Sequence, residues 1–243
     1  MWNFFKRRAE PQNPIHGNGE NWHFSAALLS DTGRQRTINE DAGRFVRDKK
    51  GLLGVVADGM GGHQAGEVAS LTAVDVACRA YQAGNGSPGR CLSNALIAAN
   101  RAVHELASGD EQLADMGTTC TALALCGGFA YLAHVGDSRV YLIRNGDIYQ
   151  MTEDHTLVMD LVRKGTITAK EAREHPERNV LQRALGRHAS VEVSGWLEGT
   201  PLRYGDLYLL CSDGLCGVLS DDTIRKAALA NDPTTACAEL IEL

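Results

Sequence analysis

The stretch "VVADGMGGHQAGEVAS", residues 55–70, changes its chemical character abruptly at Asp58. Two valines and an alanine lead into this carboxylate, and Gly59, Met60, Gly61 and Gly62 follow it directly. An apolar run that ends in Asp-Gly predicts a strand that stops at a tight turn, and the Glu-, Val- and Ala-containing segment after it predicts a helix. Glycine lets the backbone approach a ligand closely. The simplest alternative is an ordinary turn that happens to contain an aspartate.

Composition limits the classes of protein to consider. The chain has 243 residues, of which 44% are hydrophobic, and this is enough for one large domain with a sizeable core. The formal net charge of -6 gives no general attraction to nucleic acid. No apolar run reaches the roughly 18 residues of a membrane span, and the N-terminus does not have the order of a signal peptide. The 7 cysteines are scattered through apolar segments, which predicts reduced thiols in a cytoplasmic protein.

The chain divides into a leader and one domain. Residues 1–21 are rich in Pro, Asn and Gly and show no hydrophobic period, which predicts a flexible leader. Residues 22–243 contain no comparable linker and no repeat, so we expect a single domain there. Within this domain, residues 156–186 form a polar segment with helical patterning that interrupts a series of strands as a flap-like insertion. Such insertions often determine specificity.

Short apolar or alternating segments predict strands, and longer periodic segments predict helices. Strands are expected at residues 22–29, 52–57, 119–125, 129–135, 139–143, 148–151, 191–196 and 207–211. Helical spacing of apolar residues covers 68–81 and, after Ser87-Pro88, 92–106. Asn145-Gly146 is typical of a type I′ hairpin. Because the helices lie between early strands and the later strands come in hairpins, the pattern favours an α+β sandwich of antiparallel sheets.

Acidic residues recur at the ends of these strands. They are Glu40 and Asp41 in "RTINEDAG", Asp58, Asp137 in "HVGDSRVYL" and Asp213 in "LLCSDGL". A carboxylate beside glycine at a strand exit offers hard cations a charged ligand with room for a carbonyl or water. Each turn alone is ordinary, but together they indicate a metal centre. A dinucleotide fingerprint starting at Gly59 fails because residue 64 is Gln64, and no P-loop motif is present.

These acids lie in motifs that carry a family resemblance. The segments "RTINED", "VADGMGGHQAGE", "MGTTCTAL", "HVGDSRVYLIRNGDIYQMTEDHT" and "CSDGL" occur in this order and cover most of residues 22–219. They closely resemble the bacterial branch of the metal-dependent protein phosphatases, the protein phosphatase 2C family. The resemblance implies a sandwich of two antiparallel sheets flanked by helices. It also implies a monomeric serine/threonine protein phosphatase that opposes a bacterial-type kinase.

The resemblance also implies a role for each matched residue. Asp58 would bridge two Mn²⁺ or Mg²⁺ ions, and a hydroxide shared by these ions would attack phosphorus. The other metal positions are the Gly59 carbonyl on one ion, Asp213 on the other, Glu40 and Asp41 mostly through waters, and Asp137 on a third, weaker ion. Arg36 matches the arginine that grips the substrate phosphate. His63 is a candidate proton donor, three residues after the position that some family members use.

Less specific interpretations remain open beside these roles. Asp58 and Asp213 could cap turns, and Asp137 could pair with Arg139 or stabilise a hairpin. Arg36 could be a solvated surface residue, and His63 could simply begin a helix. Structural roles are expected for His134, His155, Thr118 and Thr119. For function, the alternatives are a catalytically weak phosphatase-like binding module and a phosphatase of small phosphomonoesters.

The end of the chain departs from the family pattern. In the family a further metal-binding aspartate follows the last helix, in a D-N-x-T-like segment on a strand that completes one sheet. This sequence stops at "TTACAELIEL", and residues 232–243 predict the last helix, with Pro233 at its start. We therefore expect the final strand and its aspartate to be missing, either by truncation of a longer chain or because water fills the position. The expected consequences are weak binding of the ion at Asp213, a need for millimolar Mn²⁺, an open strand edge and lower stability.

Overall fold

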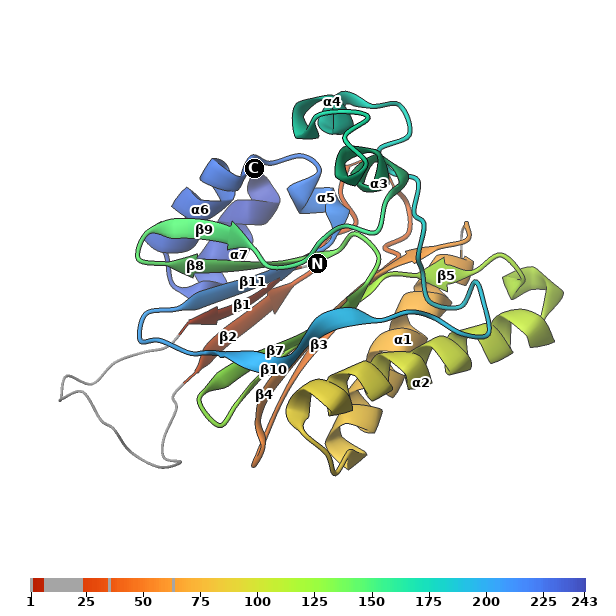
Figure 1. Ribbon diagram of the computed structural model, residues 1–243, viewed down its shortest axis with the longest axis horizontal. Helices are drawn as coiled ribbons and strands as arrows, with labels where there is room; N and C mark the ends of the chain where they lie inside the picture. The colour runs from red at the N-terminus through yellow and green to blue at the C-terminus, as the bar shows by residue number, and fades with distance from the viewer. Residues whose placement is uncertain (1, 7–23, 35, 63) are drawn as a thin grey trace.

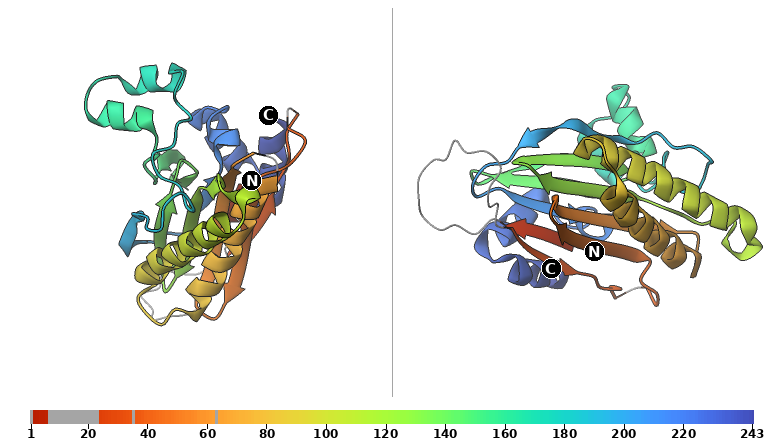
Figure 2. Two further views of the ribbon diagram at one scale, coloured as in Figure 1. Left: turned by 90° about the vertical axis from the view of Figure 1, so that its right-hand side faces the viewer. Right: turned by 90° about the horizontal axis from the view of Figure 1, so that it is seen from below.

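The computed structural model describes residues 2–6, 24–34, 36–62 and 64–243. Two antiparallel sheets pack face to face, and helices cover the outer face of each sheet (Figures 1 and 2). All strand pairs between the described residues are antiparallel. The predicted α+β sandwich is confirmed.

Each sheet brings together strands that are far apart in the sequence. The 5-stranded sheet has the order β2-β1-β11-β8-β9, with β1 Trp2–Lys6, β2 Ser25–Leu29, β8 Arg139–Arg144, β9 Asp147–Gln150 and β11 Leu207–Cys211. The 6-stranded sheet has the order β10-β7-β6-β4-β3, with β3 Asp41–Asp48, β4 Gly51–Met60, β6 Cys120–Cys126, β7 Phe129–Val135 and β10 Ser194–Pro201. The short strand β5, Gly117–Thr118, pairs with the end of β4.

Two pairs of helices complete the sandwich. The six-stranded sheet is covered by α1, Gln64–Ala83, and α2, Pro88–Gly109. The five-stranded sheet is covered by α6, Asp221–Ala230, and α7, Pro233–Glu242. Shorter helices are η1 Glu111–Leu113, α3 Leu157–Arg163, α4 Ala169–Glu174 and α5 Asp213–Cys216. No helix in the described part of the chain is long and apolar enough to cross a membrane.

The period of two along each strand explains why the central strands are apolar throughout. In β11, Tyr208 and Leu210 face the other sheet, whereas Leu207, Leu209 and Cys211 face the helices. All five residues of β11 are buried. A strand covered on both faces needs an unbroken apolar run. Strand β11 could therefore be predicted from the sequence.

Several local predictions are confirmed. The bounds of β7 and β11 match the expected ranges, and α2 begins at Pro88 after Ser87, although the Ser87 side chain makes no capping hydrogen bond. Asn145 and Gly146 both have positive φ, 55° and 88°, as a type I′ hairpin requires. Strand β3 was not predicted. It pairs only with β4, and its charged, largely exposed sequence lacks the apolar pattern of an interior strand.

The predicted flexible leader is wrong for its first residues. Residues 2–6 form β1, which lies between β2 and β11 and pairs with both. Five residues are too few to show a period, and their partners in β11 are about two hundred positions away in the sequence. As a result β11 is hydrogen-bonded on both edges, by β1 and β8. The rest of the predicted leader, residues 7–21, lies outside the described residues.

Residues 156–186 leave the sandwich and return to it at one place. Helices α3 and α4 project beyond the sheets (Figure 1), and each begins with a threonine whose side chain caps the helix, Thr156 and Thr168. An isolated bridge joins Thr156 to Leu181, and the amide of Leu157 donates to the carbonyl of Val180 at 2.9 Å. The two ends of the segment are therefore held side by side.

Candidate metal and phosphate site

Three strand ends bring the predicted acids together. The register of β3 and β4 places Asp41 directly opposite Asp58. Ser212, which follows β11, donates its hydroxyl to Asp41 Oδ2 at 2.8 Å. This contact brings the end of β11, in the five-stranded sheet, next to the Asp41 and Asp58 pair. Asp213 is the next residue and begins α5. Carboxylates from both sheets therefore meet at one end of the sandwich.

The backbone of Asp58 is held in place by hydroxyl groups. Its amide donates to Thr119 Oγ1 at 2.9 Å, and its carbonyl accepts from the Thr118 hydroxyl and the Thr119 amide, both at 2.9 Å. Thr119 Oγ1 also lies 2.7 Å from Ser138 Oγ, next to Asp137. Thr118 and Thr119 are buried, as expected. Sequence analysis did not identify Ser138 or Ser212 as partners. The signal that could have indicated them is their position in the sequence, because each serine is directly next to an acid at a strand end.

Burial and neighbouring negative charges raise the pKa values of two of these acids. Burial raises the pKa of Asp58 well above its usual value, and the negative charges of Asp41, Asp213 and Asp137 raise it further, with a hydrogen bond to Asp213. Burial, followed by the charges of Asp213 and Asp154, raises the pKa of Asp137 to about 7. A nearby cation would favour the ionised form of both groups. The crowding therefore fits a site for positive charge.

Glu40 supplies a further oxygen that fits a cation. Its Oε1 is buried and has no hydrogen-bond partner among the described residues, whereas its Oε2 accepts from Arg36 Nη1 at 3.0 Å. Buried carboxylate oxygens without a donor are rare unless an ion or water binds them. A Cβ at Gly66 would lie 2.4 Å from Glu40 Oε1, and a Cβ at Gly59 would lie 1.9 Å from the Gly66 carbonyl oxygen. The two glycines are therefore needed for this close approach.

A cavity of about 240 Å³ opens between these groups. The predicted site residues that line it are Arg36, Glu40, Asp41, Asp58 and Asp213. Asp137 does not line it and contributes through its charge. Within the described ranges, no three His, Cys, Asp or Glu side chains form a compact ligand set for one ion. Oxygen ligands that are spread in this way suit Mg²⁺ or Mn²⁺, which retain bound waters, better than a compact zinc site.

Of the two residues predicted to act on the substrate, Arg36 and His63, the structure describes only Arg36. The Arg36 side chain is 62% exposed and makes an ion pair with Glu40 Oε2 at 3.0 Å, so it stands at the mouth of the acidic cavity. His63 lies outside the described residues. Met60, directly after Asp58-Gly59, accepts a long hydrogen bond on its sulfur from Arg187 Nη2 at 3.7 Å.

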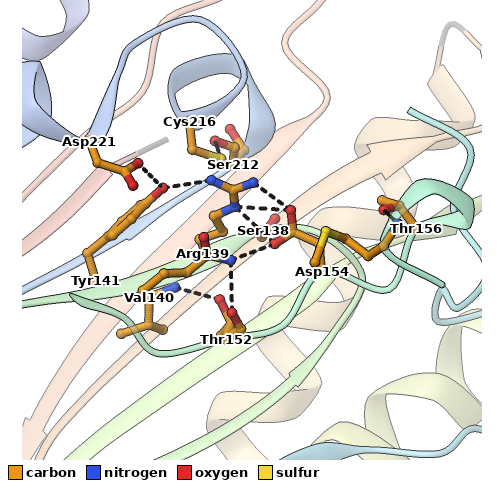
Figure 3. A network of polar contacts seen from close by, with 12 residues as sticks. Ser138, Arg139, Val140, Tyr141, Thr152, Asp154, Thr156, Ser212, Cys216 and Asp221 are labelled. Carbon is orange, nitrogen blue, oxygen red and sulfur yellow. Dashed lines mark hydrogen bonds and ion pairs between the residues drawn. The ribbon is translucent and has the colours of Figure 1, made fainter. Parts of the chain in front are cut away.

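The alternative ion pair between Asp137 and Arg139 is not formed. The Arg139 guanidinium instead binds both oxygens of Asp154, with distances between 2.6 and 3.1 Å (Figure 3). Arg139 also donates to the Tyr141 hydroxyl at 2.8 Å, and that hydroxyl donates to Asp221 at 3.2 Å. Asp137 is therefore left to face Asp58 and Asp213 without a paired arginine.

The sequence profile described as Protein phosphatase 2C matches residues 32–236 of this chain. The chain belongs to the protein phosphatase 2C family. The matched range contains Arg36 and all of the predicted metal-binding positions. The resemblance of the five motifs is thus confirmed.

Several bacterial members of the protein phosphatase 2C family are similar to this chain along most of its length. Serine/threonine protein phosphatase PstP of Mycobacterium tuberculosis is 42% identical over 220 residues, which are 89% of this chain and 41% of PstP. The chain thus spans less than half of that relative. Serine/threonine phosphatase Stp of Listeria innocua is 38% identical over 207 residues, covering 83% of this chain and 81% of Stp.

Solved structures of family members share the fold. Serine/threonine phosphatase Stp1 from Staphylococcus aureus has a TM-score of 0.80 at 34% identity, with 88% of this chain and 86% of that chain covered. The catalytic domain of PstP in complex with 2 manganese ions has a TM-score of 0.73 at 33% identity, with coverage of 100% and 91%.

Proposed function

We propose that this phosphatase 2C family chain hydrolyses phosphoserine and phosphothreonine in proteins, with Mn²⁺ or Mg²⁺ as cofactor. The observation that carries the proposal is the convergence on one cavity of Arg36 and four acids that come from three separate motifs. The names of the relatives support the same substrate class. Retention of every matched acid weighs against a catalytically weak binding module.

The proposed metal-binding groups are the oxygens that meet in and beside the cavity. They are Asp58 and the Gly59 carbonyl, Asp213, Glu40 and Asp41, with Asp137 for a further ion. Divalent cations at such a site neutralise phosphate oxygens and generate a nucleophile from water at neutral pH. No cysteine or serine is needed as a covalent nucleophile.

The chain's own residues bind and orient the substrate in this proposal. Arg36 presents a planar fork that matches two phosphate oxygens, and its ion pair with Glu40 holds it at the cavity mouth. The Thr119 hydroxyl fixes the backbone of Asp58 by accepting from its amide, and the Ser212 hydroxyl holds the Asp41 side chain by donating to its carboxylate. His63 stays a candidate donor for the leaving oxygen. The expected setting is the cytoplasm, where a monomer would oppose a serine/threonine kinase.

Phosphate release from a phosphothreonine peptide tests this proposal. The purified chain should release phosphate with Mn²⁺ and lose this activity in EDTA. Asp213→Asn should lower the activity and raise the Mn²⁺ concentration needed, whereas Asp147→Asn, in the exposed β8–β9 hairpin, should behave like the wild type. Full activity in EDTA contradicts the metal-dependent reaction. Activity on p-nitrophenyl phosphate with none on phosphopeptides would favour small phosphomonoesters as substrates.

A further inference from the structure

The loop that carries Asp137 is fastened through Gly136. Gly136 has a φ of +107°, and a Cβ at this position would lie 2.6 Å from the side chain of Thr119, so only glycine fits. Both polar backbone groups of Gly136 bind one residue, His155. The Gly136 amide donates to His155 Nδ1 at 3.1 Å, and the Gly136 carbonyl accepts from the His155 amide at 2.9 Å.

These contacts determine how the His155 ring is used. Because Nδ1 accepts from a backbone amide, the ring proton is on Nε2, which donates to Ser194 Oγ in β10 at 3.0 Å. The ring also stacks on His134 of β7, with the centroids 4.4 Å apart and the planes 14° from parallel. His155 is therefore held in one orientation by groups from two strands.

His155 also marks the point where residues 156–186 leave and rejoin the sandwich. Its carbonyl accepts from the amide of Gln182 at 2.8 Å, at the far end of that segment. On its other side, Asp154 binds Arg139, and the amide of Val140 donates to Thr152 Oγ1 at 3.3 Å (Figure 3). The segment 152–156 is thus attached both to the Asp137 loop and to the base of α3 and α4.

We propose that His155 is a positioning residue that holds Asp137 through Gly136 and couples the placement of the α3–α4 segment to the ion bound by Asp137. The proposal rests on the proposed function, since it assumes that Asp137 binds a cation. Residues that orient a metal ligand typically change affinity by about 10- to 100-fold when they are replaced. Replacement of His155 should weaken the binding of the ion that depends on Asp137 and leave the affinities for the other ions nearly unchanged.

Two isosteric substitutions separate the functions of the two ring nitrogens. His155→Asn places a carbonyl oxygen near the position of Nδ1 and can accept from the Gly136 amide, whereas His155→Gln places its amide near the position of Nε2. Mn²⁺ binding to each full-length variant is measured by calorimetric titration, beside Asp137→Ala, which defines the ion in question. We expect His155→Gln to weaken that ion by about tenfold and His155→Asn to retain it within about threefold.

The same variants are combined with Asp137→Ala as a control for general damage. If His155 acts through Asp137, His155→Gln should cause no further loss of Mn²⁺ binding in that background. A purely structural role would lower the unfolding temperature of both variants without changing Mn²⁺ affinity selectively.

Equal Mn²⁺ affinities for the Gln variant and the wild type would overturn the proposal. So would a loss that persists in the Asp137→Ala background, or an Asp137→Ala variant that binds every ion. Failure of the wild type to hydrolyse phosphopeptides with Mn²⁺ is a separate result, which would overturn the proposed function.

Discussion

Asp41 of β3 lies directly opposite Asp58 of β4, so two carboxylates face each other across one strand pair. Like charges placed directly opposite in a sheet are destabilising. In the metal-free protein, burial raises the pKa of Asp58 most, and the charge of Asp41 opposite raises it further. Bound cations would convert this repulsion into attraction. The opposed carboxylates therefore lower the stability of the metal-free protein and favour the binding of cations.

Asp58→Asn should separate stability from activity. The substitution removes one of the opposed charges, so we expect the metal-free protein to be as stable as the wild type or more stable. Phosphopeptide hydrolysis with Mn²⁺ should fall by at least about 100-fold, because a direct ligand matters more than the outer partners whose loss costs about 10- to 100-fold. Urea unfolding in EDTA and phosphate release with Mn²⁺ measure the two effects. An active variant would remove Asp58 from the metal site.

The contribution of Asp137 to the stability of the metal-free wild type should be lost as the pH rises. The pKa of Asp137 is about 7 in the folded protein and near 3.8 when unfolded. Its contribution is therefore fully present below pH 3.8 and is lost as the pH rises through 7. Saturating Mn²⁺ should reverse this trend and add about 2.7 kcal/mol at 100 times its dissociation constant. Thermal unfolding in EDTA and in Mn²⁺ over this pH range is the measurement, and identical pH profiles would contradict it.

Arg36→Lys should be a functional change with little effect on folding. Lysine keeps the charge but cannot bind two phosphate oxygens with a planar fork. We expect KM for a phosphothreonine peptide to rise by about tenfold, which corresponds to roughly 1.4 kcal/mol of lost binding. Because the side chain is 62% exposed, the free energy of unfolding should change by less than about 0.5 kcal/mol. Arg79→Lys, an exposed arginine of α1, is the matched control, and equal KM values for all three proteins would exclude a phosphate contact.

Gly66→Ala should damage both the fold and the site. Its Cβ would meet Glu40 Oε1 at 2.4 Å and the backbone carbonyl carbon of Gly59 at 3.1 Å, so either the Glu40 carboxylate or the first turn of α1 must shift. Overpacking of this kind costs about 1–3 kcal/mol. Gly109→Ala at the end of α2 is the control, since a Cβ there meets nothing within 4 Å. Urea unfolding compares the two variants, and equal midpoints would show that the close approach is not needed.

His134 should make the protein sensitive to acid. Burial first, and then the nearby His155 and Arg183, lower the pKa of His134 from 6.5 to about 3. Its contribution to stability is therefore fully present above pH 6.5 and is lost as the pH falls toward 3, by at most about 1.4 kcal/mol per pH unit. His134→Phe keeps a stacked ring without a titrating group. Urea unfolding at pH 7 and pH 5 should show a smaller loss for the variant, and parallel losses would contradict the assignment.

Local patterns in the sequence predicted those elements whose physical cause is local. The unbroken apolar run of β11, the Asn145-Gly146 turn and the proline that starts α2 depend on pleat, dihedral angle and ring geometry within a few residues. The acids of the candidate site were legible for the same reason, because each lies at or beside the end of a strand within a short motif.

Only the tertiary structure decided how these pieces meet. The pairing of Asp41 with Asp58 depends on the register of β3, a charged strand whose sequence gave no clear signal. Arg139 binds Asp154 instead of its near neighbour Asp137 because the fold brings residues 152–156 back against the loop after β7. Strand β1 and the double contact between His155 and Gly136 are likewise long-range. Such contacts are formed by strand register and chain return, and the free energy that selects them comes from burial across the whole sandwich rather than from any short segment.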